Sequence, residues 1–214
     1  MTTYDPAERM RQLTEGAWSD PAHPARRAGD ELRRLVRYVL AGNLDDAALG
    51  ELATQLNAIG GEAATGSRYG LGHGMSPAEV TNLRPNLNGT HPLAGPVNAI
   101  APPIRIQPAG ERALGDVTYD ARFEGMPGLV QGGFIAAGFD LMLGQAVLLS
   151  GTGGPTGTLT VRYRAPTPLD SPLRYETWTE RIEGRRVHVS GTLTDLASGT
   201  VTAEAEGIFI SPRR

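Results

Sequence analysis

One segment constrains the architecture of this chain more than any other: Gly132-Gly-Phe-Ile-Ala-Ala-Gly-Phe-Asp140-Leu-Met-Leu-Gly144. It belongs to an apolar run of sixteen residues that starts at Phe134, and only Asp140 and Gln145 interrupt this run with polar side chains. The run is short for a membrane-spanning helix and polar near its centre. We therefore predict a helix that is buried inside a globular domain.

Alternating apolar and polar residues lie on both sides of this helix. Before it, Val117, Tyr119, Ala121 and Phe123 alternate with polar residues, as in a half-buried strand. After it come four more alternating runs, which are separated by turn segments rich in Pro, Gly and Asp. These runs cover residues 158–164, 173–182, 186–194 and 201–210. The pattern predicts an α+β fold in which a four-stranded antiparallel meander, preceded by one or two further strands, curves around the helix.

The first part of the chain has a helical period instead. Apolar residues from Leu32 to Leu40 fall on one face of a helix, and a second apolar face runs through residues 45–59. We expect residues 1–62 to form a helical hairpin that serves packing or oligomerisation. Residues 63–89 are rich in Gly, Ser, Pro and Asn and are expected to be a linker or arm, with the main domain at residues 90–214.

Composition excludes several kinds of chemistry. The chain has no cysteine, and all twenty of its basic side chains are arginines, which excludes thiolate nucleophiles and Schiff-base lysines. A net charge of −3 gives no bulk attraction to nucleic acid or to an anionic membrane, so neither is expected as a partner. The four histidines lack the spacing of a metal site, and no metal is expected. The first residues lack a secretory signal, which predicts a cytoplasmic location.

Asp140 is the strongest candidate for a catalytic side chain. Burial of an unpaired carboxylate in an apolar helix is costly, so this position needs a reason. One reason is a role as general base or nucleophile, and the other is a hydrogen bond to nearby backbone or a solvent-filled groove. Gly128, Gly132 and Gly133 precede the helix, where glycines either form a plain turn or let a carbonyl oxygen approach the free N–H groups of the first turn.

The segment Glu124-Gly-Met-Pro-Gly-Leu-Val-Gln131-Gly-Gly-Phe-Ile-Ala-Ala-Gly-Phe-Asp140 resembles the signature of PaaI-like hot-dog acyl-CoA thioesterases. In that signature His-Gly-Gly opens the central helix, and an acidic residue follows nine positions after the His. The run that begins at Thr158 resembles the next strand of the family and its proline turn, and the last two alternating runs resemble its final strands. The resemblance covers roughly residues 90–211. It implies a hot-dog fold, in which a curved antiparallel sheet wraps a long central helix.

The resemblance also implies a role for each matching residue. Asp140 would activate water or attack the thioester carbon, the Gly132 N–H would polarise the carbonyl, and Thr158 would orient the water from the partner subunit. The implied substrate is an acyl-CoA, with coenzyme A as part of the substrate and no separate cofactor. A homodimer or a dimer of dimers is implied as well, because the active sites of the family lie at the dimer interface.

Gln131 departs from the family pattern, which usually has His at this position. Glutamine donates and accepts hydrogen bonds but does not titrate near neutral pH, so an enzyme that needs the charge would be slow or inactive. A non-catalytic acyl-CoA-binding module or sensor therefore stays open as an alternative. A sensor that binds DNA through residues 45–59 is disfavoured, because that segment is acidic. A hot-dog hydratase is disfavoured because no matching His–Asp constellation is found.

Several further side chains are candidates for contact with the substrate. Glu124 is expected either as a second carboxylate facing the pocket or as a salt-bridged strand end. Arginine forks suit phosphate geometry, so four arginines are candidate ligands for the phosphates of coenzyme A. These are Arg162, Arg164, Arg185 and Arg186. The sequence leaves open the length of the acyl group and whether its carrier is coenzyme A or an acyl carrier protein.

Overall fold

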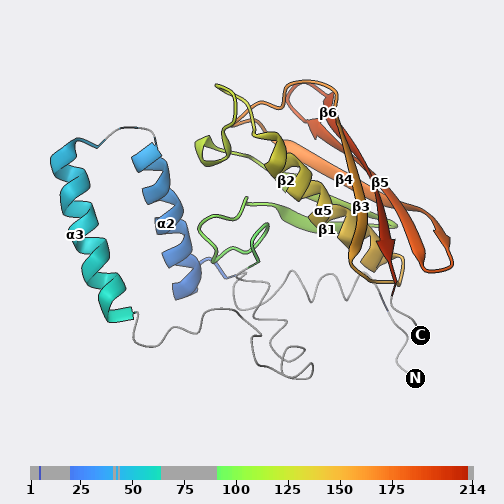
Figure 1. Ribbon diagram of the computed structural model, residues 1–214, viewed down its shortest axis with the longest axis horizontal. Coiled ribbons are helices and arrows are strands. Elements are labelled where there is room, and N and C mark those ends of the chain that lie inside the picture. Colours follow the sequence, from blue (N-terminus) through green and yellow to red (C-terminus); the bar gives the residue numbers. More distant parts are fainter. Residues whose placement is uncertain (1–4, 6–19, 41, 43, 64–90, 212–214) are drawn as a thin grey trace.

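A sheet with a helix across one face forms the second half of the chain in the computed structural model (Figure 1). The structure describes residues 5, 20–40, 42, 44–63 and 91–211, so the predicted linker lies almost wholly outside the described residues. In chain order the elements are α2 (Pro24–Leu40), α3 (Asp46–Ala63), β1 (Arg105–Ala109), β2 (Arg112–Val117), the 3-10 helix η4 (Ala121–Phe123), α5 (Gly132–Leu149), β3 (Thr156–Tyr163), β4 (Leu173–Glu183), β5 (Arg186–Asp195) and β6 (Thr200–Ile210).

The strands form one antiparallel sheet in the order β1-β2-β4-β5-β6-β3. Every second residue of β5 from Val187 to Asp195 is buried, as the alternating sequence predicts. α5 lies across the face of the sheet that carries these buried residues, and it packs mainly on β4 and β2 (Figure 1). The predicted α+β architecture, a long helix against an antiparallel sheet, is confirmed.

The core lies between α5 and the sheet. Phe139, Met142, Leu143 and Val147 of α5 are almost completely buried there. By length and composition alone, this helix is long and apolar enough to cross a membrane, contrary to the expectation from sequence. Its packing on the sheet accounts for the apolar side chains of one face, while Asp140 lies on the other, partly exposed face.

Two buried tyrosines hold the amino-terminal half of α5 against the sheet. The hydroxyl oxygens of Tyr119 and Tyr175 are 2.8 Å apart, and the Tyr175 hydroxyl donates to the Ile135 carbonyl at 3.2 Å. Burial raises the pKa of both tyrosines, so both remain neutral hydrogen-bonding groups at physiological pH. Gly138 leaves the space that these hydroxyls occupy, because a Cβ at this position would collide with the Tyr175 hydroxyl and lie 3.0 Å from that of Tyr119.

The predicted strand through Val117, Tyr119 and Phe123 is wrong in its second half. β2 ends at Val117, and the 3-10 helix η4 follows. Asp120 stabilises this turn, because its carboxylate accepts a hydrogen bond from the Arg122 N–H. Tyr119 and Phe123 are nevertheless both buried and meet edge to face at 5.3 Å, whereas Ala121, which was also predicted to be buried, is exposed in the 3-10 turn.

The predicted four-stranded meander is also wrong at its first strand. Only β4, β5 and β6 form a meander, whereas β3 pairs with β6 at the sheet edge. The connection from β3 to β4 contains three prolines, which lack N–H groups. It is held by the loop before α5, since Val130 N–H donates to the Thr167 carbonyl and Leu169 N–H donates to the Gly128 carbonyl. The chain therefore passes the amino-terminal end of α5 instead of folding back as a hairpin.

The helices predicted in the first part of the chain are present as α2 and α3, and each extends beyond the apolar period that predicted it, while most of residues 1–19 of the predicted hairpin lie outside the described residues. Gly42 in the connection between them has a φ of +66°, which favours glycine. α2 is fixed to the main domain by Arg33, whose guanidinium donates to the carbonyls of Gly95 and Asn98 at 3.0 and 2.8 Å. The backbone at Gly29 packs closely on the Val97 carbonyl, leaving no room for a side chain.

Substitution of two glycines of α5 tests how the Tyr119–Tyr175 pair packs against this helix. Gly138→Ala should lower the free energy of unfolding by about 1–3 kcal/mol, because the new methyl group meets two buried hydroxyls. Gly144→Ala should raise it by about 0.5–1 kcal/mol, because alanine favours helix and the nearest atom, on Phe209, lies at 3.7 Å. Urea denaturation of the two variants checks both signs. Equal effects at the two positions would contradict the role assigned to the tyrosine pair.

Candidate functional site

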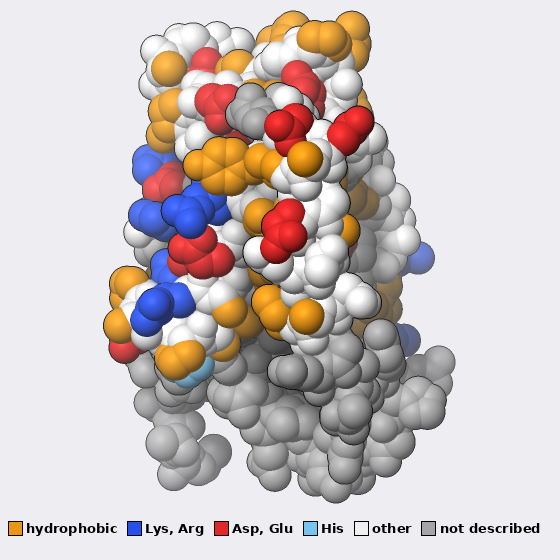
Figure 2. Space-filling model, turned by 90° about the vertical axis from the view of Figure 1, so that its left-hand side faces the viewer, with side chains coloured by type: hydrophobic (Ala, Val, Ile, Leu, Met, Phe, Trp, Pro, Cys, Tyr) orange, Lys and Arg blue, Asp and Glu red, His pale blue; other side chains and the backbone are white. Residues whose placement is uncertain are grey.

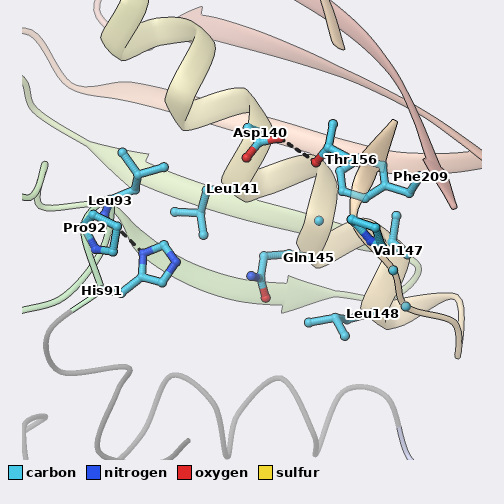
Figure 3. A pocket seen from close by; sticks show the side chains of 14 residues that line it. His91, Pro92, Leu93, Asp140, Leu141, Gln145, Val147, Leu148, Thr156 and Phe209 are labelled. Carbon is cyan, nitrogen blue, oxygen red and sulfur yellow. Dashed lines mark hydrogen bonds between the residues drawn. The ribbon is translucent and has the colours of Figure 1, made fainter. Parts of the chain in front are cut away.

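Asp140 reaches from α5 toward the first residue of β3 (Figure 3). Thr156 donates its hydroxyl to Asp140 Oδ1 at 2.7 Å. Both residues line a cavity of about 450 Å³, so the carboxylate is in contact with open space as well as with a hydrogen-bond donor. Asp140 is therefore placed where it can reach a bound molecule.

The walls of this cavity are apolar with a few polar groups. α5 contributes one wall of the cavity, made of Asp140, Leu141, Gly144, Gln145, Val147 and Leu148. The segment from His91 to Leu93 forms another wall (Figure 3). His91 Nδ1 accepts a hydrogen bond from the Leu93 N–H at 3.1 Å, and burial lowers the pKa of this imidazole, which keeps it neutral at pH 7. Gln145 Oε1 is buried and has no hydrogen-bond partner among the described residues.

The amino-terminal end of α5 borders a second cavity of about 520 Å³. Gln131 is the N-cap of the helix, and its Oε1 accepts a hydrogen bond from the Phe134 N–H at 3.2 Å. Tyr163 donates its hydroxyl to the Gly132 carbonyl at 2.8 Å. The N–H groups of Gly132 and Gly133 belong to the first turn and have no partner within the helix. This end of α5 therefore presents oriented N–H donors beside the cavity.

The predicted catalytic residues fall into two separate groups. Gly132 and Asp140 are eight residues apart on one helix, which places them about 12 Å apart along its axis. A carbonyl group spans far less, so one chain cannot present both residues to the same thioester. We call Asp140 with Thr156 the acid half-site, and Gln131 with Gly132 the amide half-site.

The threonine that contacts Asp140 within one chain is Thr156, while the role implied for Thr158 lies across the subunit interface and stays a prediction. Thr158 lies two residues further along β3 and is exposed, in register with Ile208 of β6. The register with β6 shifts between Thr156 and Thr158. Within one chain, the hydroxyl at the carboxylate is that of Thr156.

Glu124 closes the loop before α5. Its Oε1 accepts a hydrogen bond from the Gly128 N–H at 2.7 Å, and Gly128 has a φ of +76°, which favours glycine. Glu124 does not line either of the two cavities, whereas its neighbours Gly125 and Met126 line the second one. In this arrangement Glu124 and Gly128 shape the loop that leads to the amide half-site.

The candidate arginines lie on the sheet rather than in the cavity of Asp140. Arg162 and Arg164 form cross-strand ion pairs with Glu206 and Glu204 of β6, at 2.6 and 2.7 Å. Arg164 also lines the second cavity, beside the amide half-site. Arg185 donates to the Ser211 carbonyl and, like Arg186, is exposed at the turn between β4 and β5. Of the four, Arg164 is the one that the structure brings to a half-site.

Sequence reasoning missed four residues at these cavities: His91, Gln145, Thr156 and Tyr163. Gln145 could have been found, since it lies one helical turn and a half after Asp140 and is the second polar interruption of the apolar run. In the sequence, Thr156 directly follows Gly153-Gly-Pro155 and is therefore easily taken for part of a loop. His91 precedes the first strand, which begins at Arg105, by more than ten residues, and its place opposite α5 follows from the tertiary fold alone.

Comparison with known proteins finds relatives that are all thioesterases among those described below. No protein-family model matches the chain. A crystal structure of a thioesterase superfamily protein has a TM-score of 0.75 and 30% sequence identity, and the match covers 89% of this chain and 92% of that one. Acyl-coenzyme A thioesterase THEM4 of Mus musculus is 34% identical over 87 residues, 41% of this chain. Acyl-coenzyme A thioesterase THEM5 of Homo sapiens is 27% identical over 107 residues, half of this chain.

The matched segments span only 37% and 43% of these two curated proteins. The relative of known structure, in contrast, is matched over nearly the whole of both chains. The resemblance found in the sequence is thereby confirmed. This chain belongs to the thioesterase superfamily.

Proposed function

We propose that this chain hydrolyses acyl-CoA thioesters to a free acid and coenzyme A. The observation that carries the proposal is the Asp140–Thr156 pair, a carboxylate with an oriented hydroxyl on the wall of a largely apolar cavity. An apolar cavity suits an acyl group, and a carboxylate at its wall suits the activation of water. The likeness to curated acyl-coenzyme A thioesterases supports the same substrate class.

In the proposed reaction Asp140 removes a proton from water, and the hydroxide forms a bond to the thioester carbon. The carbonyl oxygen becomes an oxyanion, which accepts a hydrogen bond from the Gly132 N–H and is further stabilised by the positive end of the α5 dipole. The carbon–sulfur bond then breaks, and the leaving thiolate takes the proton from Asp140. Direct attack by Asp140 would instead form an anhydride that water cleaves. Neither route uses a separate cofactor.

The 12 Å between the half-sites requires two copies of the chain in this mechanism. β3 lies at the sheet edge and six of its eight residues are exposed, so its outer backbone edge is free to pair among the described residues. Antiparallel pairing of two β3 strands about a two-fold axis places two α5 helices antiparallel to each other. The amide half-site of one copy then lies opposite the acid half-site of the other. We propose this homodimer as the minimal active unit.

A non-catalytic acyl-CoA-binding module is the second candidate. It is favoured by Gln131, which occupies the position of the usual His and uses its Oε1 to cap α5. Binding without turnover would then depend on the same two cavities.

Removal of the carboxylate separates the two candidates. Asp140→Asn should lower kcat on a panel of acyl-CoAs by about 10²- to 10⁴-fold, because the amide cannot accept the proton from water. Coenzyme A release and acyl-CoA affinity are measured on the same preparations. Undiminished turnover in Asp140→Asn would remove the assignment, and tight binding without turnover in the parent chain would favour the binding module.

Two threonines of β3 provide a test variant and a control variant for the acid half-site. Thr156→Val removes a hydrogen bond to a charged group worth about 1.5–3 kcal/mol, so kcat/KM should fall roughly 10- to 100-fold. Thr158→Val changes an exposed residue two positions away and should have a much smaller effect. Steady-state kinetics of both variants give the comparison. The reverse order would restore Thr158 to the role that the resemblance implies.

Subunit mixing tests whether the two half-sites act across an interface. Gly132→Pro deletes the N–H at the first helical position, which tolerates proline, and should lower kcat by about 10²- to 10³-fold. Gly132→Ala keeps the N–H and adds a methyl group near Tyr163, which provides the control for crowding. After unfolding and refolding together, Gly132→Pro and Asp140→Asn chains should recover about a quarter of the parent activity, since half of the random dimers then contain one intact site. No recovery would contradict a shared site.

A further inference from the structure

Gln145 is a polar side chain on the apolar helix α5, and its amide forms no hydrogen bond with the described residues. The Oε1 atom is buried, whereas the rest of the side chain lines the cavity of Asp140. A buried acceptor without a partner lowers the stability of a fold, and leucine, which has a similar shape, would avoid that cost. A role in binding a molecule in the cavity would explain why glutamine stands here.

His91 presents a second hydrogen-bond donor to the same cavity. Because its Nδ1 accepts from the Leu93 N–H, the neutral imidazole carries its proton on Nε2. Burial lowers the pKa of His91, so the ring is in this neutral form near pH 7. In Figure 3 the second ring nitrogen of His91 and the amide nitrogen of Gln145 point toward each other. Two N–H donors cannot bond to each other, so an acceptor placed between them would satisfy both.

The charge around this cavity favours an uncharged acceptor. Asp140 is the one charged side chain among the described residues that line it. Arginines lie elsewhere, for example on the end of the molecule that carries α2 and α3 (Figure 2). A carboxylate or phosphate in the cavity would be repelled by Asp140 without a compensating cation. The acceptor that fits is therefore the oxygen of a hydroxyl or carbonyl group.

The position of the two donors indicates which part of a thioester they would contact. Gln145 lies five residues after Asp140, which is about 7.5 Å along the axis of α5. The cavity walls between them are apolar and include Leu141 and Leu148, which suit an acyl chain. Arg164, which suits a phosphate of coenzyme A, lines the second cavity instead. An acyl chain in the first cavity would thus bring an oxygen to the donors several carbon atoms beyond the thioester carbon.

We propose that Gln145 and His91 determine specificity, favouring acyl groups that carry an uncharged oxygen toward the far end of a medium-length chain. The inference rests on the proposed function for the direction in which the substrate lies, but the selection itself is a property of binding. Gln145 and His91 would donate to the same oxygen while Asp140 acts at the thioester. An unsubstituted chain would leave both donors without a partner and is therefore expected to bind less well.

Three thioesters of equal chain length test this selection: 8-hydroxyoctanoyl-CoA, octanoyl-CoA and the coenzyme A monothioester of octanedioic acid. The value of kcat/KM for the hydroxylated substrate should exceed that for octanoyl-CoA by about 10-fold or more, and the charged substrate should be the poorest. Gln145→Leu and His91→Phe should each lower the preference for the hydroxyl several-fold. Gln107→Leu is the matched control, because this exposed residue of β1 lines neither cavity and its substitution should leave the preference unchanged.

Two further measurements separate the inference from the folding of the variants and from the proposed function. Gln145→Leu should raise the urea midpoint, because it removes a buried oxygen without a partner, so a lost preference cannot be assigned to poorer folding. Calorimetric affinities of the same thioesters for the parent chain and for Asp140→Asn should show the same preference without turnover. A parent chain that hydrolyses none of them would remove the proposed function, while the affinities still decide the selection.

Three outcomes would overturn the inference. The first two are equal affinities for octanoyl-CoA and 8-hydroxyoctanoyl-CoA, and binding of neither thioester. The third is an equal loss of affinity for both thioesters in Gln145→Leu, which would assign these donors to the coenzyme A arm that the two substrates share.

Discussion

The one-sided packing of α5 determines where chemistry can occur in this molecule. The sheet covers one face of the helix, so Phe139 and Leu143 are fully buried while Asp140 stays partly exposed. Successive residues on a helix point about 100° apart, and a rotation by one residue would carry the carboxylate into the core. A carboxylate without partners is costly there. The Tyr119–Tyr175 pair, which Gly138 accommodates, opposes such a rotation and so holds Asp140 at Thr156 and the cavity.

The sequence predicted those parts of the fold that depend on local patterns. Burial in β5 and in α5 follows the period of the apolar residues, and even Phe123 is buried as predicted although it lies in a 3-10 turn. The position of β3 could not be predicted, because it depends on where a proline-rich connection is held by hydrogen bonds from the loop before α5. Thr156 was missed for a related reason, since the register of β3 changes at its first residue.

The capping role of Gln131 bears on the departure from the family signature. Its side chain supplies an acceptor to the Phe134 N–H, which is the usual work of an N-cap residue and needs no charge. The first-turn N–H groups at Gly132 and Gly133 remain available for a ligand, and Tyr163 fixes the Gly132 carbonyl from β3. The amide half-site is therefore built from backbone groups and from hydrogen bonds between uncharged side chains and the backbone. In the proposed mechanism these N–H groups would polarise a carbonyl without an imidazole.

The separation of the half-sites requires a second copy of the chain in the proposed mechanism. The distance between Gly132 and Asp140 is set by the rise of a helix, and no movement of side chains can shorten it. α2 contacts η4, and the Arg37 guanidinium lies 3.7 Å from the Asp120 carboxylate at the start of that turn. η4 leads directly into the loop that ends at Gln131. α2 thus steadies the segment that positions the amide half-site, while a copy paired through β3 would bring the acid half-site to it.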